Sequence, residues 1–494
     1  MKKTITLGIA PVKRGFLSME AAKAQKDKFM AAIASLNIKV LKIVDIDDLC
    51  ENGIASSPDV VPKAVEKFKD ARIDALFIPF CDFGAELVAS GIAAAFRLPT
   101  LVWGARDEAP NTPGARGRDT QCGLFASTKV MRNYGVKFSY IFNEPSDSPA
   151  FKEGFTNFIR FTAIVRDMNG LRVLKIGDRP TDFLSVQANE AELSNKFNIT
   201  VVPASPSSMI QQALALVNFV EPDDPSALDQ RAKAQYETQK KSVAVMDEYV
   251  EDLKKRFNTI TFNRGFPGSP GVSDDVNLKK CAALKVVIQN VMEQQNCSVA
   301  AFECWSAFSF GYGICPCQAV GDLTDEGLPL SCECDTYGAI TMAILRAASL
   351  YEDSCFLADL TIRHPDNDNA ELLWHCGPFP YSLKDPKSEA GLQHGQQVFE
   401  LKQGELTLAR LGELEGEYYL FAGEGKTTTG PETTNTYVWL ETDNWKCWEE
   451  KLMFGPYIHH IGAIYGNYLP VLREACRYLG INLDNAHEQG VYSL

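Results

Sequence analysis

Short apolar runs alternate with helical periods over the first 170 residues, and this alternation restricts the possible folds more than any other feature. "TITLGIAP" precedes a helical pattern from Ser18 to Leu36, "NIKVLKIVDI" precedes "VPKAVEKFKDA", and "IDALFIPF" precedes "AELVASGIAAAF". Continuous apolar strands separated by amphipathic helices are typical of a parallel sheet covered on both faces. We therefore expect residues 1–170 to form a doubly wound α/β domain.

The same alternation starts again at "LRVLKIGDRPTDF" (171–183) and continues around a charged helical segment from about Asp229 to Arg256. This pattern predicts a second α/β domain over residues 171–350. Beyond it, runs such as "QQVFELKQGELTLARL" are joined by Gly, Asn and Asp turns, which indicates hairpins. The expected fold is two doubly wound α/β domains followed by a mostly β C-terminal domain (351–494).

The bulk composition narrows the range of partners. The net charge is −14, which argues against nucleic acid, because phosphate binding needs a basic surface, and against anionic membranes. No stretch approaches 18 apolar residues, so no transmembrane helix is expected. "MKKTITLGIAPVKRGF" lacks a small-residue cleavage site, and we interpret it as the first strand of a cytoplasmic protein. The 14 cysteines are scattered, so we expect reduced, partly buried thiols.

Three groups of polar residues in apolar surroundings are candidates for chemistry. Glu303 ends the apolar run "SVAAFE", and ligands bind at the carboxyl ends of strands in open α/β sheets. Glu333 and Asp335 lie in "CECDTYGAI", directly before a segment that should be buried. His459 and His460 are adjacent in a chain with only six histidines. Each group also has a purely structural interpretation, as a solvated strand end, a loop or a pair of hydrogen-bonded core histidines.

Two interpretations of the metal chemistry follow from these residues. "CPC" at 315–317 and "CEC" at 332–334 suggest a cysteine site, but both have C-x-C spacing where zinc sites use C-x₂₋₄-C. Glu303, Asp335 and His460 instead provide two carboxylates and one imidazole. Such a set suits a hard to borderline divalent ion, Mn²⁺ above all, with Mg²⁺ or Co²⁺ as alternatives, and leaves positions open for a substrate.

The chain resembles the L-fucose isomerase and L-arabinose isomerase superfamily, and in particular the L-fucose isomerase-like proteins. The resemblance covers most of the chain, and its most specific pieces are "FEC" at 302–304, "DEGLPLSCECDTYGAIT" at 325–341, "WHCG" at 374–377 and "HHIGAIYG" at 459–466. It implies two α/β domains followed by a mostly β domain. The family's metal site consists of a Glu, an acid and a C-terminal His, which fall on Glu303, Asp335 and His460.

The resemblance also implies a function. We expect a metal-dependent aldose–ketose isomerase that works through an ene-diol, with Glu303 and Asp335 as acid/base pair as well as metal ligands. Further residues are expected to contact or orient the sugar: Arg14, His375, Trp439 and Glu333. The family assembles as hexamers or trimer-based oligomers, so we expect a homo-oligomer whose only other partner is a monosaccharide.

Two other classes of function remain open from the sequence. A non-catalytic sugar-binding protein would not need the Glu, Asp and His set. A metal-dependent sugar epimerase or aldolase on the same scaffold would need it and would differ in its product. The sugar itself is also left open, because L-fucose, D-arabinose, L-arabinose and a hexose with a charged group at C6 all fit the pattern.

Overall fold

The computed structural model describes residues 3–110, 116–263 and 273–489. The chain divides into two compact units. The first consists of residues up to 166 together with 470–479, and the second of residues 167–469 together with 480–494. The three-domain division expected at 170/171 and 350/351 stays a prediction.

The first unit is built on a five-stranded parallel sheet of order β2-β1-β3-β4-β5. Its strands are β1 (Ile5–Ile9), β2 (Leu41–Val44), β3 (Ala75–Phe80), β4 (Thr100–Gly104) and β5 (Ser139–Tyr140). Its helices are α1 (Met19–Ser35), α2 (Val60–Asp70), α3 (Glu86–Ala94), α4 (Thr120–Asn133), α5 (Pro149–Met168) and α13 (Leu469–Leu479), with the short 3₁₀ turn η1 (Glu51–Gly53).

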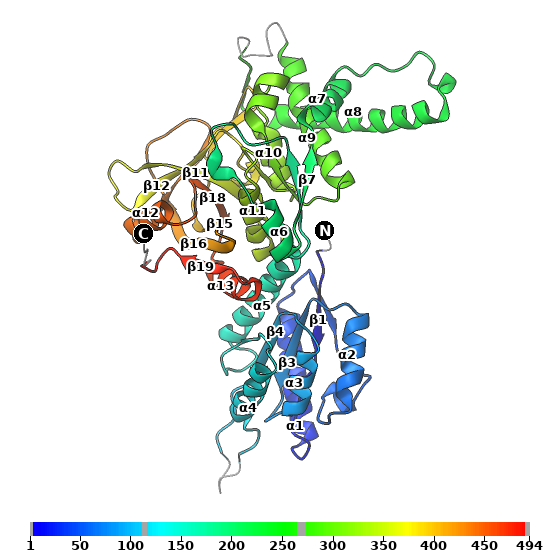
Figure 1. Cartoon of the computed structure of the whole chain (residues 1–494), viewed down its shortest axis with the longest axis vertical. Coiled ribbons are helices and arrows are strands. Elements are labelled where there is room, and N and C mark those ends of the chain that lie inside the picture. The colour runs from blue at the N-terminus through cyan, green and yellow to red at the C-terminus, as the bar shows by residue number, and fades with distance from the viewer. Residues whose placement is uncertain (1–2, 111–115, 264–272, 490–494) are drawn as a thin grey trace. The chain divides into compact units, whose positions relative to one another are not determined.

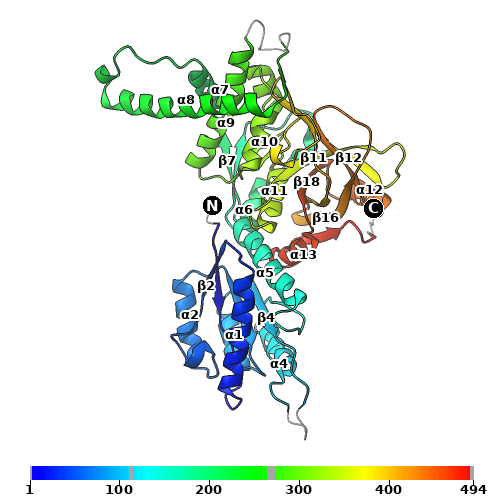
Figure 2. The same ribbon diagram turned by 180° about the vertical axis from the view of Figure 1, so that it is seen from behind.

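Alternate residues of β3 face opposite sides of this sheet, which explains its two helical layers. Phe77 packs edge-on against Phe29 of α1 and Phe155 of α5. Its neighbours Leu76 and Ile78 belong instead to the core formed with α2, α3 and α4. The two opposite views show these layers from either side (Figures 1 and 2). The parallel, doubly covered sheet expected from the alternating pattern is confirmed.

A second parallel sheet, of order β10-β9-β6-β7, lies in the second unit. Its strands are β6 (Arg172–Ile176), β7 (Thr200–Ala204), β9 (Val299–Phe302) and β10 (Leu330–Ser331). Its helices are α6 (Glu190–Phe197), α7 (Pro206–Val217), α8 (Gln230–Arg256), α9 (Asp274–Gln294), α10 (Cys317–Asp325) and α11 (Thr336–Ala348), with the π-helix η4 (Cys304–Tyr312) and the 3₁₀ turns η2 (Leu184–Val186) and η3 (Pro225–Ala227).

The remaining strands of this unit include a closed barrel, which the sequence pattern did not predict. β16 pairs with both β15 and β17, so six antiparallel strands close in the order β16-β15-β18-β11-β12-β17. These strands are β11 (Cys355–Arg363), β12 (Ala370–His375), β15 (Glu405–Leu414), β16 (Glu417–Thr428), β17 (Thr436–Glu441) and β18 (His460–Tyr465). Flanking them are β8 (Thr259–Thr261), β13 (Gly391–Gln393), β14 (Gln396–Glu400), β19 (Asn482–Asn485), α12 (Trp445–Phe454) and η5 (Tyr381–Leu383).

Helix α11 connects the second parallel sheet to the barrel. It packs against β9 and β10 on one side and against β11, β15 and β18 on the other, and it is buried along almost its whole length. Its first turn therefore brings the loop after β10 close to the barrel strands. Within the described residues, no helix is long and apolar enough to cross a membrane.

Candidate active site

The loop between β10 and α11 carries "CECD", the segment that places two acids before a buried helix. Glu333 and Cys334 both have positive φ (54° and 56°), a backbone conformation that side chains other than glycine rarely adopt and that is often found at functional sites. The turn ends at Asp335, whose side chain accepts a hydrogen bond from the backbone N–H of Gly338 and so caps α11. This turn directs Glu333 and Asp335 to different partners.

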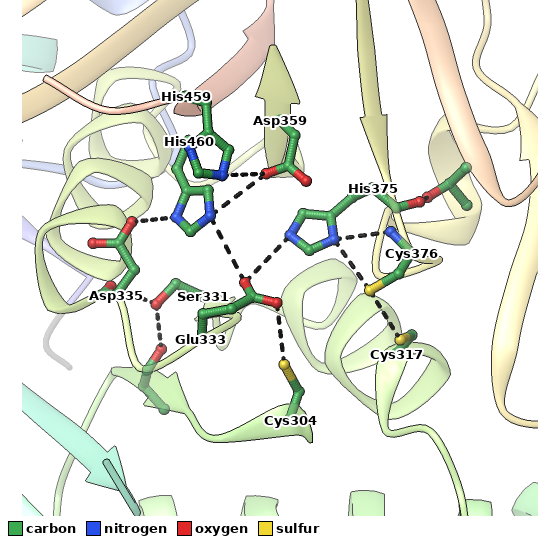
Figure 3. Close-up of polar contacts among 12 residues, drawn as sticks. Cys304, Cys317, Ser331, Glu333, Asp335, Asp359, His375, Cys376, His459 and His460 are labelled. Carbon is green, nitrogen blue, oxygen red and sulfur yellow. Dashed lines mark hydrogen bonds and ion pairs between the residues drawn. The ribbon is translucent and has the colours of Figure 1, made fainter. Parts of the chain in front are cut away.

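Glu333 points toward two histidines that the barrel strands supply, and Asp359 lies on the far side of one of them (Figure 3). Its Oε2 lies 3.7 Å from Nε2 of His375 and 3.9 Å from Nε2 of His460. The same nitrogen of His460 lies 3.5 Å from Oδ1 of Asp359. Asp359 and His460 are cross-strand partners on β11 and β18, and His375 ends β12. Two carboxylates and two imidazoles, brought from four segments of the chain, therefore converge.

Three of the converging atoms have no hydrogen-bond partner among the described residues, although all are buried: Oε2 of Glu333, Oδ1 of Asp359 and Nε2 of His375. A buried polar atom without a partner costs about 1–3 kcal/mol, so native proteins keep such atoms mainly where a ligand, an ion or water satisfies them. Their convergence in one place indicates a binding site for a group that the chain itself does not supply.

The orientation of His460 is fixed by a buried ion pair. Nδ1 of His460 lies 2.9 Å from Oδ2 of Asp335, and Arg410 of β15 donates from both terminal nitrogens to the same carboxylate. Burial raises the pKa of Asp335, but the charges and hydrogen bonds of Arg410 and His460 outweigh it and hold that pKa well below its usual range. An ionised Asp335 can only accept, so Nδ1 of His460 carries the proton. With Nδ1 bound to Asp335, Nε2 is the ring nitrogen of His460 that faces Glu333 and Asp359, and it is the atom oriented for metal binding.

His375 has the opposite arrangement. The backbone N–H of Cys376 donates to Nδ1 of His375 over 2.9 Å, which leaves the ring proton on Nε2, the atom directed at Glu333. Burial lowers the pKa of His375, but the negative charges of Asp359 and Cys376 outweigh it and raise that pKa well above its ordinary value. His375 is therefore suited to donate a hydrogen bond, and His460 is suited to act as a ligand.

The donor set fits a divalent metal ion. Glu333, Asp359 and His460 supply two carboxylate oxygens and one imidazole nitrogen, the ligand types that Mn²⁺ and similar ions accept. An octahedral ion with bonds of about 2.1 Å needs neighbouring ligand atoms about 3 Å apart. Nε2 of His460 lies 3.9 Å from Oε2 of Glu333 and 3.5 Å from Oδ1 of Asp359, so both carboxylates would have to move toward an ion bound at His460. His459 also lies within 3.9 Å of Asp359 and extends this group of potential ligands toward the surface.

Aromatic side chains lie beside this group. The ring of Phe183 is 6.2 Å from that of His459 and 6.3 Å from that of His460, and Trp305 lies 5.1 Å from Phe183. Trp305 is 44% exposed, so part of its face is available to a ligand. Aromatic faces next to polar groups are common in pockets that bind sugars and other amphipathic small molecules.

The two carboxylates that the sequence grouped with His460 are both held by other partners in the structure. Glu303 lies at the carboxyl end of β9, as expected, but its Oε2 accepts from the backbone N–H of Asp178 and its Oε1 from the hydroxyl of Ser306. Asp335 contacts His460 at Nδ1 and is otherwise occupied by Arg410. The assignment of Glu303 and Asp335 as metal ligands stays a prediction, and these contacts favour Glu333 and Asp359 in their place.

Of the residues expected to bind sugar, Glu333 and His375 lie in the cluster, whereas Trp439 and Arg14 do not. Trp439 is buried beside Leu372 and Tyr437, and its Nε1 donates to the carbonyl of Pro431. Arg14 lies in the first unit, after β1, with its guanidinium over the ring of Phe83. A role for either residue in sugar binding stays a prediction.

Asp359 is the residue that sequence reasoning missed. It lies within "CFLADLTI", an apolar run whose pattern predicts only a strand. The available signal was a carboxylate in an otherwise apolar run, because a charge is rarely placed inside a strand unless it is paired or binds a ligand. Its pairing with His460 across 101 positions could not be read from the sequence.

Replacing Asp335 by Asn should lower the free energy of unfolding by about 3–5 kcal/mol, because Arg410 would stay buried without a carboxylate. Urea unfolding followed by circular dichroism measures the change. Asp368→Asn is the matched control, since Asp368 pairs with Arg363 at the surface with a 99% exposed side chain, and should leave stability nearly unchanged. Equal effects of the two substitutions would show that the buried pair adds no special stability.

Comparisons with known proteins match this chain over two separate domains. The N-terminal domain of the fucose/sulfoquinovose isomerases matches residues 8–169, and the C-terminal domain of L-fucose isomerase matches residues 387–487. A sulfoquinovose isomerase from Priestia megaterium (strain ATCC 12872 / QMB1551) is 24% identical over 492 residues, covering 97% of this chain and 99% of the relative. A sulfoquinovose isomerase from Alkalicoccus urumqiensis is 26% identical over 349 residues, 69% of each chain.

The two domains occur in the expected order and together cover more than half of the chain, and the first of these relatives aligns over nearly the full length of both proteins. This agrees with the resemblance seen in the motifs around Glu333 and His460. The chain belongs to the L-fucose isomerase-like family of aldose–ketose isomerases.

Proposed function

We propose that this protein is a divalent-metal-dependent aldose–ketose isomerase whose ion is held by Glu333, Asp359 and His460. The observation that carries this proposal is the convergence of Oε2 of Glu333, Oδ1 of Asp359 and Nε2 of His460. Two of these atoms are buried without a hydrogen-bond partner in the described part of the chain. Mn²⁺ is our first choice of ion, because a set of two carboxylates and one imidazole suits harder ions than zinc.

The reaction needs a proton moved between neighbouring carbons of an open-chain sugar. When bound, a divalent ion would polarise the sugar carbonyl and acidify the adjacent C–H. Glu333 and Asp359 are the carboxylates at the site, so one takes the proton from C2 and returns it to C1 by way of an ene-diol, while the other serves the proton exchange between O1 and O2. His375 donates from Nε2 to a sugar oxygen.

We infer that the substrate is a hexose with a negatively charged group at C6, and sulfoquinovose is the first candidate. This rests on the relatives, which carry the name sulfoquinovose isomerase. Incubation of the metal-loaded protein with a panel of aldoses, including sulfoquinovose, L-fucose and D-arabinose, tests it. Formation of a ketose of equal mass supports isomerisation. A C2-epimeric aldose or two smaller fragments would identify an epimerase or an aldolase instead.

Removal of divalent metal should abolish turnover, and Mn²⁺ should restore it best. The physical reason is that Glu333, Asp359 and His460 supply the oxygen and nitrogen donors that would hold the ion, and the ion would polarise the sugar carbonyl. Ketose formation is measured after dialysis against EDTA and again after addition of Mn²⁺, Mg²⁺ or Co²⁺, with bound metal quantified in parallel. Full activity in protein that holds less than about one ion per ten chains would contradict metal dependence.

The roles of the two glutamates can be separated by a matched pair of substitutions. Glu333→Gln should lower turnover by at least ~10²-fold and weaken Mn²⁺ binding, because it removes a ligand and a candidate proton carrier. Glu303→Gln should cost less than about tenfold, because Glu303 binds the loop at Asp178 and Ser306. Turnover and bound Mn²⁺ are measured for both. Loss of metal only in the Glu303 variant would restore the assignment made from the sequence.

We propose further that the protein is a homo-oligomer, a hexamer or another trimer-based assembly, in which Arg14 completes the sugar site of a neighbouring copy. Arg14 follows β1, and its backbone N–H donates to Asp82 in the loop after β3, so both lie at the carboxyl edge of the first sheet, where ligands bind in this fold. Light scattering should give a multiple of 54.5 kDa. An active, monodisperse monomer would refute the shared site.

A further inference from the structure

A row of four thiols lies beside Glu333 and His375, and Figure 3 shows three of them, Cys304, Cys317 and Cys376, on the side away from Asp359. The thiols come from the start of the π-helix, the start of α10, the loop after β10 and the end of β12: Cys304, Cys317, Cys332 and Cys376. Each C-x-C pair of the sequence contributes one member. The metal chemistry proposed above uses none of these sulfur atoms.

Cys317 and Cys376 form a close pair, with their Sγ atoms 3.5 Å apart. Cys376 is also in contact with the active site, because its Sγ lies 3.2 Å from Nδ1 of His375. At the other end of the row, Cys304 donates to Oε1 of Glu333 over 3.3 Å. The row therefore touches both an acid and an imidazole of the site.

Cys317 and Cys376 differ in their exposure and in the pKa of their thiols. Cys376 is partly exposed, whereas Cys317 is only 2% exposed. Hydrogen bonds from Cys317 and Cys332, together with the positive charge of His375, hold the pKa of Cys376 well below its usual value. The pKa of Cys317 is raised, since its proton is shared with Cys376. A thiol whose pKa is lowered thus lies beside one whose pKa is raised, an arrangement that favours thiol–disulfide exchange.

We propose that Cys317 and Cys376 form a reversible oxidation site for hydroperoxides beside the active site. The sulfur of Cys376 attacks one oxygen of the peroxide and the O–O bond breaks, while the thiol proton passes to the departing oxygen, so that a sulfenic acid and one water form. The Cys317 thiol then attacks that sulfur, and a second water leaves as the disulfide forms. Overall, two thiols are oxidised to one disulfide, and one hydrogen peroxide is reduced to two waters.

The disulfide changes the surroundings of His375. Its S–S bond is about 2 Å long, so the two Sγ atoms must approach each other from 3.5 Å, and movement of Cys376 toward Cys317 would draw its Sγ away from Nδ1 of His375. His375 points its Nε2 at Glu333, so the disulfide would disturb a residue of the proposed catalytic site. This part of the inference rests on the proposed function. Loss of an orienting contact of this kind typically costs about 10–100-fold in activity. We expect turnover to fall about tenfold on oxidation, with the metal retained and the loss reversed by dithiothreitol.

The test treats the metal-loaded, full-length protein with hydrogen peroxide, blocks the remaining thiols and measures the intact mass. The expected product has lost two hydrogens, and a protease digest gives a linked peptide pair containing Cys317 and Cys376. Linkage of Cys332 to either Cys304 or Cys376, or oxidation of Cys376 to the sulfinic acid only, would overturn the proposal. The mapping uses the natural protein, so it does not depend on any variant folding or on isomerase activity.

Two matched variants then test whether the disulfide between Cys317 and Cys376 causes the loss of turnover. Cys317→Ser should keep basal turnover and lose the reversible inhibition by peroxide, because no partner thiol remains for Cys376. Cys355→Ser is the control: Cys355 is also fully buried, its Sγ donates to the carbonyl of Met342, and its replacement should leave the inhibition intact. If the disulfide forms without changing turnover, the proposed effect on His375 is wrong. If the protein proves not to be an isomerase, the loss of two hydrogens seen in the intact mass would still be expected.

Discussion

The buried ion pair between Asp335 and Arg410 is the constraint on which the candidate active site depends. Asp335 begins α11, Arg410 lies on β15, and His460 begins β18, so one carboxylate joins a helix of the α/β part to two strands of the barrel. A buried charge of this kind is tolerated only when its partner and its hydrogen bonds are complete. The arrangement therefore fixes the distance and register between α11 and the barrel as well as the orientation of His460.

That fixed orientation explains why two histidines in one cluster differ in chemistry. His460 is protonated at Nδ1 by its contact with Asp335 and offers a lone pair at Nε2. His375 accepts a backbone hydrogen bond at Nδ1 and offers a proton at Nε2. Glu333 lies between the two nitrogens. The site thus combines a potential metal ligand and a hydrogen-bond donor around one carboxylate, a useful combination for binding a polyol and moving its protons.

Sequence reasoning and the structure point to the same segments of the chain but favour different residues within them. "CECD" and "HHIGAIYG" are both present at the cluster, and His460 occupies the place expected for an imidazole ligand. Within "CECD", however, two successive residues adopt positive φ, so the direction of each side chain depends on a turn that residue spacing alone does not reveal. Asp335 is turned toward Arg410, and Glu333 is turned toward the histidines. Asp359 was missed because an isolated acid in a strand does not show what lies opposite it.

The sequence by itself determined the local elements, because the periodicity of apolar residues follows from the geometry of strands and helices. It predicted the parallel α/β layers, the long charged helix that became α8, and the mostly β character of the C-terminal part. It did not predict that six of those strands close into a barrel, since the pairing of β16 with β17 joins residues that no local pattern relates. Only the tertiary structure decided which polar atoms converge, because their positions depend on long-range strand register and on which buried charges are already paired.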